Sequence, residues 1–149
     1  MFRSLIQTWP TWITMPLRLA LGAVFIAHGA QKVLGVWGGA GLAAFVDGQA
    51  PLGLRPAWLW LGAAAISELL GGALILLGLV TRVGALMIAA VMLVAMFGVH
   101  WSGGFFLQNR GIEFTVALLG MALALLISGG GRASFDEALF NRRQSFRRR

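Results

Sequence analysis

Four long apolar runs, separated by shorter polar segments, dominate the pattern of hydrophobic and polar positions along the chain. They cover about residues 13–33, 57–80, 83–101 and 112–128. An α-helix rises about 1.5 Å per residue, so runs of this length come close to or exceed the ~30 Å hydrocarbon core of a bilayer. The pattern therefore predicts an all-α, polytopic membrane protein built as a four-transmembrane-helix bundle.

The composition supports a membrane protein and excludes other classes. Of the 149 residues, 58% are hydrophobic and 11% are charged, and the mean hydropathy is +0.82, which leaves too little polar surface for a soluble globule. The first run is too long for a cleavable signal peptide and carries Arg18, His28 and Lys32. The absence of cysteine excludes disulfides and thiolate metal sites. The net charge of +7 comes largely from the C-terminal tail, so it indicates a membrane surface, and no nucleic-acid motif accompanies it.

Tryptophan and arginine positions predict how the bundle lies in the membrane. The six tryptophans flank the runs, as expected of indoles at the headgroup layer; they are Trp9, Trp12, Trp37, Trp58, Trp60 and Trp101. Most arginines fall on one side of the predicted bundle, and only Lys32, Arg55 and Arg110 fall on the other. The positive-inside rule then places both termini in the cytoplasm, in a bacterial inner (plasma) membrane. Arg18 and Arg82 are interpreted as topology residues.

Two of the connections between the runs have a predicted structure. Runs two and three join through a minimal turn near residues 79–82, which makes them an antiparallel hairpin. The glycine-rich segment 34–56 is long and contains a predicted short helix at 42–48. It would act either as a lid over a cavity or as a solvated connector.

We expect residues 1–131 to form the membrane domain and residues 132–149 to form a basic cytoplasmic tail. Within the tail, Ser134 and Glu137 have the spacing of a capping box at a helix N-terminus. Apolar side chains alternate there with arginines, which favours an amphipathic helix at the membrane interface; the apolar residues are Phe135, Leu139, Phe140 and Phe146.

Glu68 is the only ionisable residue in the run 57–80 and lies near its middle. A carboxyl group at that depth costs at least ~2.5 kcal/mol on insertion scales, so it needs a partner inside the protein or a function that requires it. Side chains lean toward the N-terminus of their helix, which brings Glu68 and the i,i+4 pair His28 and Lys32 toward each other from antiparallel helices. His28 matches Glu68 best in depth, so we expect a His28–Glu68 pair, with Lys32 as the next candidate.

His100, at the end of the third run, and Glu113, at the start of the fourth, would extend this polar cluster in the outer half of the bundle. Small residues accompany both acids on their helix faces, and small residues mark helix contacts in membranes. We therefore expect both acids to face the bundle interior; the small residues are Ala64, Gly71, Gly72 and Gly78 beside Glu68, and Ala117, Gly120 and Ala124 beside Glu113. Structural alternatives stay open. A Glu68 pair can simply fix helix register, Lys32 can extend to the surface, and His100 and Glu113 can be ordinary interfacial residues.

An ordered set of short motifs across the four runs resembles the DoxX family of small bacterial membrane proteins. The motifs are Arg18-Leu-Ala-Leu-Gly22, His28-Gly29-Ala-Gln-Lys32, Glu68-Leu-Leu-Gly71-Gly72, Gly78-Leu-Val-Thr81-Arg82, Gly111-Ile-Glu113 and Ser134-Phe-Asp136. The resemblance extends from about Thr14 to Leu139. It implies a four-helix membrane protein linked to respiratory-type redox chemistry, similar to subunits of terminal quinol oxidase and thiosulfate:quinone oxidoreductase complexes.

The resemblance implies a quinone as the bound redox group, and the polar residues supply groups that suit one. Glu68 and His28 are the candidate catalytic residues, because quinone chemistry moves protons together with electrons. The candidate quinone-binding residues are Lys32, Gln31, His100 and Glu113. No metal site is expected. A b-type haem is disfavoured, because it needs two axial histidines and the chain has only His28 and His100, of which His100 lies near the surface.

Two readings from other classes remain open. The chain can be a non-catalytic accessory or anchor subunit that assembles a membrane redox complex, with the polar cluster joining its helices. As a third reading, it can be a small transporter or proton path, since acid and histidine side chains can relay protons. The expected partners are the lipid bilayer, other membrane or peripheral redox subunits, and copies of the chain itself.

Overall fold

The structure, a computed structural model, describes residues 5–139, and the regular secondary structure in this range is helical, with no strand. Its helices are α2 (Thr14–Leu34), α3 (Gly41–Val46), α4 (Ala57–Leu77), α5 (Thr81–Ala95) and α6 (Glu113–Ser128). A π-helical turn, Met96–His100, and a 3-10 turn, Trp101–Gly103, extend α5. The all-α prediction is therefore confirmed for the described residues.

Three of the described helices are long and apolar enough to cross a membrane: Thr14–Leu34, Ala57–Leu77 and the extended third helix Thr81–Gly103. The fourth, α6, is apolar but has 16 residues, which gives it a length of about 24 Å. The helical lengths thus fit a membrane helical bundle, in which α6 is shorter than the other three.

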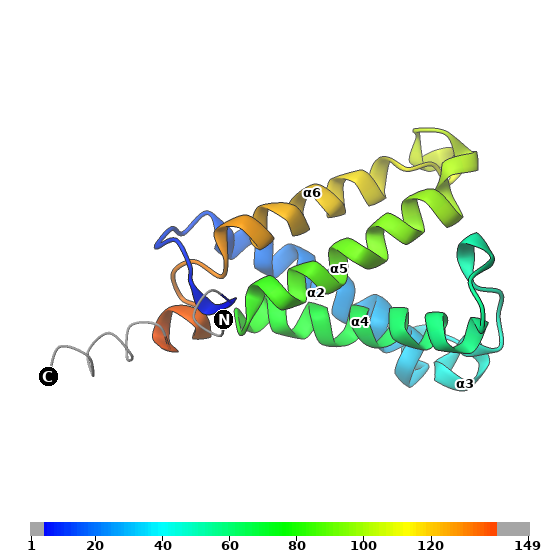
Figure 1. The fold of residues 1–149 in the computed structure, drawn as a ribbon, viewed down its shortest axis with the longest axis horizontal. Helices are drawn as coiled ribbons and strands as arrows, with labels where there is room; N and C mark the ends of the chain where they lie inside the picture. Colours follow the sequence, from blue (N-terminus) through cyan, green and yellow to red (C-terminus); the bar gives the residue numbers. More distant parts are fainter. Residues whose placement is uncertain (1–4, 140–149) are drawn as a thin grey trace, which may run out of the picture.

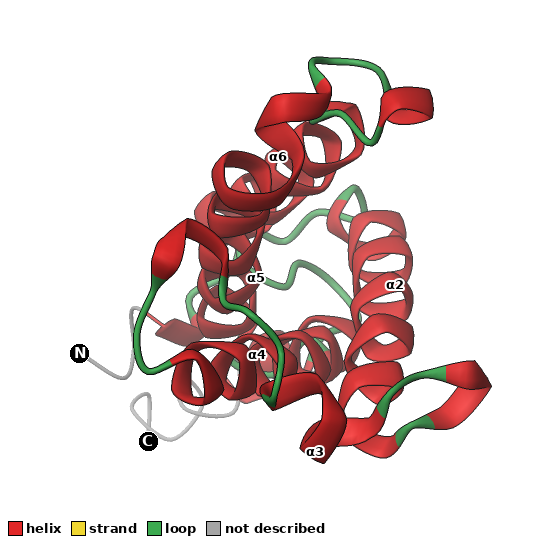
Figure 2. Ribbon diagram, turned by 90° about the vertical axis from the view of Figure 1, so that its right-hand side faces the viewer, coloured by secondary structure: helices red, strands yellow, loops and turns green. Residues whose placement is uncertain are grey.

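The long helices pack in chain order, α2 against α4, α4 against α5, and α5 against α6, whereas α2 and α6 meet over a small area. Figure 1 shows both ends of the described chain at one end of the bundle, which we call the termini end. The segment around α3 and the α5–α6 connection lie at the opposite end, which we call the loop end. Figure 2 shows α2 and α6 as the two outer members of the series.

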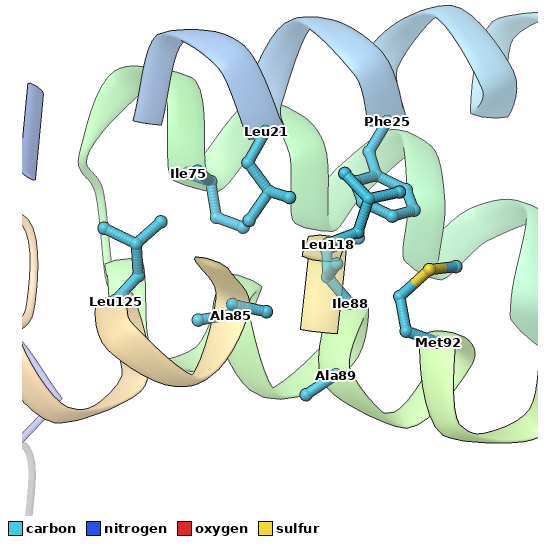
Figure 3. Packing of buried hydrophobic residues seen from close by; sticks show 10 residues of the cluster. Leu21, Phe25, Ile75, Ala85, Ile88, Ala89, Met92, Leu118 and Leu125 are labelled. Atoms are coloured by element: carbon cyan, nitrogen blue, oxygen red, sulfur yellow. The ribbon is translucent and has the colours of Figure 1, made fainter. Parts of the chain in front are cut away.

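Apolar side chains from all four long helices fill the middle of the bundle (Figure 3). Phe25, Ile75, Ile88 and Leu125 are among the fully buried ones. Their burial against one another, rather than against lipid, requires close packing of the helices, since lipid tails are as apolar as the side chains themselves. The core is therefore held by shape complementarity across helix faces.

Glycines bring α2 and α4 into backbone contact. A Cβ added at Gly29 would lie 2.6 Å from the Cα of Leu69, and one added at Gly72 would lie 2.8 Å from the backbone nitrogen of Ile26. A Cβ at Gly22 would meet the Cβ of Leu76 at 2.8 Å. Such small-residue contacts are the usual way in which membrane helices approach closely. They fix which face of α2 points at α4.

The predicted connections are present with shifted boundaries. The α4–α5 turn is short, because α4 ends at Leu77 and α5 begins at Thr81, with Gly78 in the left-handed conformation at φ 66°. The short helix expected at 42–48 is α3 (Gly41–Val46), which packs on α2 and α4. All six tryptophans are exposed at or near helix ends, as expected for headgroup contacts.

Candidate functional site

Glu68, near the middle of α4, forms an ion pair with Lys32, which lies in the last turn of α2. Both carboxylate oxygens of Glu68 accept hydrogen bonds from Lys32 Nζ. The Glu68 side chain is 5% exposed and the Lys32 side chain is 27% exposed. Glu68 lies 11 residues into α4, or about 16 Å from its loop end. The acid thus faces the interior as expected, but its partner is the second candidate, Lys32, and the preferred His28–Glu68 pair is wrong.

The glycine contact between α2 and α4 explains why lysine is the partner. Gly29 marks the face of α2 that touches α4. Successive residues turn by about 100°, so Lys32 is about 60° away from Gly29 around the helix and His28 about 100° away on the same side. The ammonium group is also carried on a long, flexible stem that can reach toward Glu68. His28 is turned past the contact and is exposed.

His28 nevertheless shares a helix face with core residues. Leu21, Phe25, His28 and Lys32 follow at steps of four, three and four residues, so they form one stripe along α2. Leu21 and Phe25 are buried in the core, whereas His28 is exposed and Lys32 is partly so. The other helices bury the part of the stripe nearer the termini end. They leave the part nearer the loop end exposed, where α2 lies apart from α5 and α6 (Figure 2).

The segment between α2 and α4 covers the ion pair from the loop end. Lys32 Nζ lies 5.5 Å from the centroid of the Phe45 ring in α3, within the range of a cation–π interaction. Gln31, expected near a ligand, instead donates a hydrogen bond from Nε2 to the carbonyl oxygen of Trp37 at 3.4 Å. Gln31 therefore ties the start of this segment to α2.

His100 and Glu113 belong to a different structural unit from the ion pair. His100 Nδ1 lies 2.8 Å from the carbonyl oxygen of Arg110, and Glu113 Oε2 accepts a hydrogen bond from the Leu107 N–H at 2.9 Å. Both interactions lie within the α5–α6 connection. Glu113 is exposed, so the expectation that it faces the interior is wrong. Glu113 is the first residue of α6, and its side chain bonds the connection that precedes the helix.

The small face of α6 is also not where the sequence analysis expected it. Ala117, Gly120 and Ala124 are exposed, and a Cβ added at Gly120 would meet nothing within 4 Å. The buried face carries Thr115, Leu118, Ala122 and Leu125. Because α6 packs on α5 through this face, the face with Ala117, Gly120 and Ala124 points away from the bundle.

A second buried polar cluster, at the termini end, contains Arg18. Its side chain is 5% exposed and donates hydrogen bonds to the carbonyl oxygens of Ile75 and Leu76, at 3.0 and 2.9 Å. It also donates to those of Gly130 and Ala133, at 3.1 and 3.2 Å. A cation near the C-terminus of a helix complements the helix dipole. Arg18, expected to be a topology residue, thus caps α4 and holds the segment after α6.

Asp136 completes this cluster and was not among the expected site residues. Its carboxylate is 1% exposed and accepts hydrogen bonds from the backbone N–H groups of Val80 and Thr81, at 2.7 and 2.8 Å. It also accepts one from the Thr81 hydroxyl at 2.7 Å. The Asp136 carboxylate therefore caps the N-terminus of α5 from a segment 55 residues away, in the manner of an N-cap side chain. The signal in the sequence was an acid directly after Ser134 and Phe135, next to Glu137, in a tail rich in arginine.

The remaining tail predictions are met in part within the described residues. The backbone N–H of Glu137 donates to Ser134 Oγ at 3.1 Å, one of the two bonds of a capping box. Residues 135–139 are helical, and Phe135 is exposed. Arg82 donates to the carbonyl oxygens of Gln7 and Ile127, at 3.2 and 2.8 Å. Phe140, Phe146 and the last arginines lie outside the described residues.

A family model, DoxX, matches residues 13–101. The chain belongs to the DoxX family. The match includes Arg18, Lys32 and Glu68, whereas Glu113 and Asp136 lie beyond it. No curated protein and no solved structure matches the chain. Family membership and the apolar helices together make this DoxX protein a membrane protein embedded in the lipid bilayer.

The ion pair of this DoxX protein has hydrogen-bonding capacity left over. An ammonium group has three N–H donors, and Glu68 uses two of those on Lys32. The exposed imidazole of His28, one turn away on the same stripe, makes no hydrogen bond to residues 5–139. No group of three His, Asp or Glu side chains that could hold a metal ion gathers within those residues. The chemistry offered by the described site is proton donation and acceptance beside an apolar core.

Proposed function

We propose that this DoxX protein is an integral membrane subunit of a quinone-linked redox complex, and that the Lys32–Glu68 pair and His28 bind the quinone head group and handle its protons. The observation that carries the proposal is the ion pair itself. Opposite charges are buried between apolar helices, where a charge costs at least ~2.5 kcal/mol, and part of the pair is open to a ligand.

The described residues fit a quinone head group. A quinone presents two carbonyl oxygens, which need donors, and an apolar ring and tail, which need an apolar wall. The free N–H of Lys32 and the imidazole of His28 supply donors on one stripe of α2. One turn nearer the termini end the same stripe enters the apolar core, where Phe25 is buried with Met92 and Leu118, so the donors border apolar surroundings (Figure 3). When bound, a quinone supplies two-electron chemistry coupled to two protons.

Glu68 is the residue of this site that can both take and release a proton. As a carboxylate it stabilises the Lys32 ammonium, and this holds the donor at the end of the stripe. A proton shared across the pair can pass between the two groups without leaving a bare charge in the apolar interior, because the pair is neutral in either state. His28 is exposed on the side away from α4 and can exchange protons with the surroundings.

The topology proposed for this subunit has four membrane spans, including the short α6, with both termini in the cytoplasm of a bacterial inner membrane. The start of α5, which carries Arg82, and the segment after α6, which carries Arg132, lie at the termini end. The segment before α4, which carries Arg55, and the α5–α6 connection, which carries Arg110, lie at the loop end (Figure 1). The arginine-rich tail that follows adds to the termini end. Alkaline phosphatase fused after residue 149 should be inactive if this orientation holds, and active if it is reversed.

An accessory role is the second candidate. It is favoured because the buried polar side chains already have hydrogen-bond partners within the protein. Within residues 5–139, every buried side-chain nitrogen and oxygen has a hydrogen-bond partner. The Lys32–Glu68 pair thereby joins α2 to α4 without any ligand. In this role the chain would assemble a redox complex with other subunits or with copies of itself. The Lys32–Glu68 pair would only hold α2 and α4 together.

Removal of both charges separates the two roles. Replacing a buried ion pair with apolar residues of similar volume is often neutral or stabilising, whereas removal of one partner costs about 3–5 kcal/mol. We therefore expect the double variant Lys32→Met/Glu68→Leu to insert and assemble like the parent, and Glu68→Leu alone to be impaired. Complexes purified from native membranes in mild detergent are assayed for co-purified quinone and quinol turnover per complex.

The proposed function requires that the double variant lose bound quinone and turnover while it keeps its partners. Retention of both in the double variant would refute a quinone-handling role for the pair and leave the accessory role. His28→Leu is the matched functional variant, because its side chain is exposed and is not needed for packing within the described residues. Unchanged quinone content in His28→Leu would remove His28 from the site.

A further inference from the structure

The connection between α5 and α6 is a compact knob whose outer surface is apolar. It covers residues 101–112, at the loop end of the bundle, and lies apart from α3 in Figure 1. Large apolar side chains on and beside it are exposed to between 43% and 60%; they are Phe97, Trp101, Phe105, Phe106, Leu107 and Phe114. An exposed apolar surface of this kind marks a site that contacts lipid or another protein.

The backbone of the knob is largely paired within itself. The N–H groups of Gly104 and of the five residues from Asn109 to Glu113 donate to carbonyl oxygens of residues 101–107. The Leu107 N–H donates to the Glu113 carboxylate, and the carbonyl of Arg110 pairs with His100. Glycines make this possible, because a Cβ at Gly111 would lie 2.6 Å from the backbone of Phe105. A non-helical segment can meet the hydrocarbon boundary only if its polar backbone groups are satisfied in this way.

The length of α6 indicates what the knob meets. At about 24 Å, α6 falls about 6 Å short of a ~30 Å hydrocarbon core. The shortfall must be made up at one end by other parts of the chain or by thinning of the bilayer. The knob continues directly from the loop end of α6, and phenylalanine and leucine, unlike tryptophan, prefer acyl chains to headgroups. The knob also carries Gln108, Asn109 and Arg110, all exposed, which suit the headgroup layer.

We propose that residues 104–112 enter the lipid at the bilayer boundary, with Phe105, Phe106 and Leu107 among the acyl chains and Arg110 among the phosphates. The knob extends α6 to the membrane surface and anchors the loop end of the bundle in one leaflet. Glu113 and His100 are positioning residues for this anchor, since they occupy polar backbone groups that lipid could not satisfy. The inference is independent of quinone binding.

The absence of cysteine from the chain allows a direct test with single introduced thiols. The protein is placed in nanodiscs of phosphatidylcholine and phosphatidylglycerol, where both faces are open to water. Phe106→Cys is compared with Asp47→Cys, an exposed site just after α3, and with Leu123→Cys, an exposed site on α6. Each thiol is labelled with a water-soluble maleimide, and a nitroxide at each site is tested for collision with oxygen and with a nickel chelate.

The proposal predicts that Phe106→Cys behaves like Leu123→Cys. Its labelling should be at least about tenfold slower than that of Asp47→Cys, because forming a thiolate against hydrocarbon is costly. Its nitroxide should be relaxed by oxygen more than by the nickel chelate. Labelling as fast as at Asp47 would overturn the proposal and show a water-facing surface suited to a protein partner.

Variants at Glu113 test the positioning role by the same readout. Glu113→Gln keeps an oxygen that can accept from the Leu107 N–H, so the Phe106→Cys thiol should stay protected. Glu113→Leu removes the acceptor, so labelling at that thiol should rise. Equal labelling in the two variants would show that Glu113 does not order the knob. Because quinone turnover is not measured, a failed redox proposal would leave this result unaffected.

Discussion

Asp136 should contribute more to the stability of this protein than any other acid outside the ion pair. Asp136→Ala removes three hydrogen bonds at 2.7–2.8 Å from a carboxylate that is 1% exposed. Loss of an N-cap costs about 0.5–2 kcal/mol, and a hydrogen bond to a charged group is worth about 1.5–3 kcal/mol. Because the three bonds share one carboxylate, their values do not add fully. We expect a loss of roughly 3–4 kcal/mol in the free energy of unfolding.

The cost should spread beyond α5, because Asp136 also docks the C-terminal segment. The Asp136 backbone N–H donates to the carbonyl oxygen of Gly78 at 2.9 Å. When the segment comes loose, Arg18 loses two of its four carbonyl acceptors. Asp136→Asn keeps one acceptor oxygen and the shape, so it should lose about half as much as Asp136→Ala, roughly 2 kcal/mol.

Unfolding in mixed micelles of mild detergent and dodecyl sulfate measures these differences, followed by far-ultraviolet circular dichroism. Glu137→Ala is the matched control, since it removes an acid one residue further on whose side chain bonds no described residue. Its effect should stay within about 0.5 kcal/mol. If Asp136→Ala and Glu137→Ala shift the transition equally, the C-terminal segment does not cap α5 in the membrane protein.

Two further predictions concern helix packing and the Arg18 cap. Gly29→Ala forces a methyl group against the backbone of Leu69 and should destabilise the α2–α4 contact by about 1–3 kcal/mol in the same unfolding assay. Gly120→Ala is the matched control, because the space around Gly120 is open. It should be neutral or stabilising by up to about 1 kcal/mol. Arg18→Met removes four hydrogen bonds from a buried guanidinium to carbonyl oxygens and should lose at least about 3 kcal/mol. A loss no larger than that of Arg82→Met, whose hydrogen bonds are exposed, would contradict this account.

The positions of the helices and the inward direction of Glu68 could be predicted from the sequence, because both follow from local patterns. An apolar run whose helical length approaches the thickness of the bilayer core indicates a helix by itself. The face that Glu68 shares with Gly71 and Gly72 fixes its direction, since these glycines are buried where α4 meets its neighbours. No knowledge of other helices is required for either step.

The partner of Glu68 could not be predicted, because it depends on how α2 is rotated. His28 and Lys32 lie on one stripe and differ by only about 40° around the helix. The contact of Gly29 with Leu69 selects between them, and that contact involves two helices far apart in the sequence. The position of His28 along the helix matched that of Glu68 better. The rotation of α2 and the longer side chain of Lys32 nevertheless make Lys32 the partner.

The same limit explains the errors on α6 and the omission of Asp136. Ala117, Gly120 and Ala124 form a small face, but small residues indicate a contact only if a neighbour is available, and α5 packs on the other face. In the sequence, Asp136 is one of two adjacent acids in a tail rich in arginine. Its role depends on the α4–α5 turn, which presents the free N–H groups of Val80 and Thr81 to a segment 55 residues away.

The hydrogen-bond partners of the ionisable side chains in the long helices separate those with a structural role from those without one. Arg18 donates hydrogen bonds to carbonyl oxygens of α4 and of the C-terminal segment, and Arg82 donates to those of Gln7 and Ile127. The Glu113 carboxylate accepts a hydrogen bond from the Leu107 N–H. These groups satisfy backbone atoms at helix ends, so each has a structural reason to be there. Lys32, Glu68 and His28 satisfy no backbone atom within the described residues. The proposed function assigns the presence of this charged pair in the apolar interior to a ligand, so the ion pair, rather than the larger cluster at the termini end, is the place to test for one.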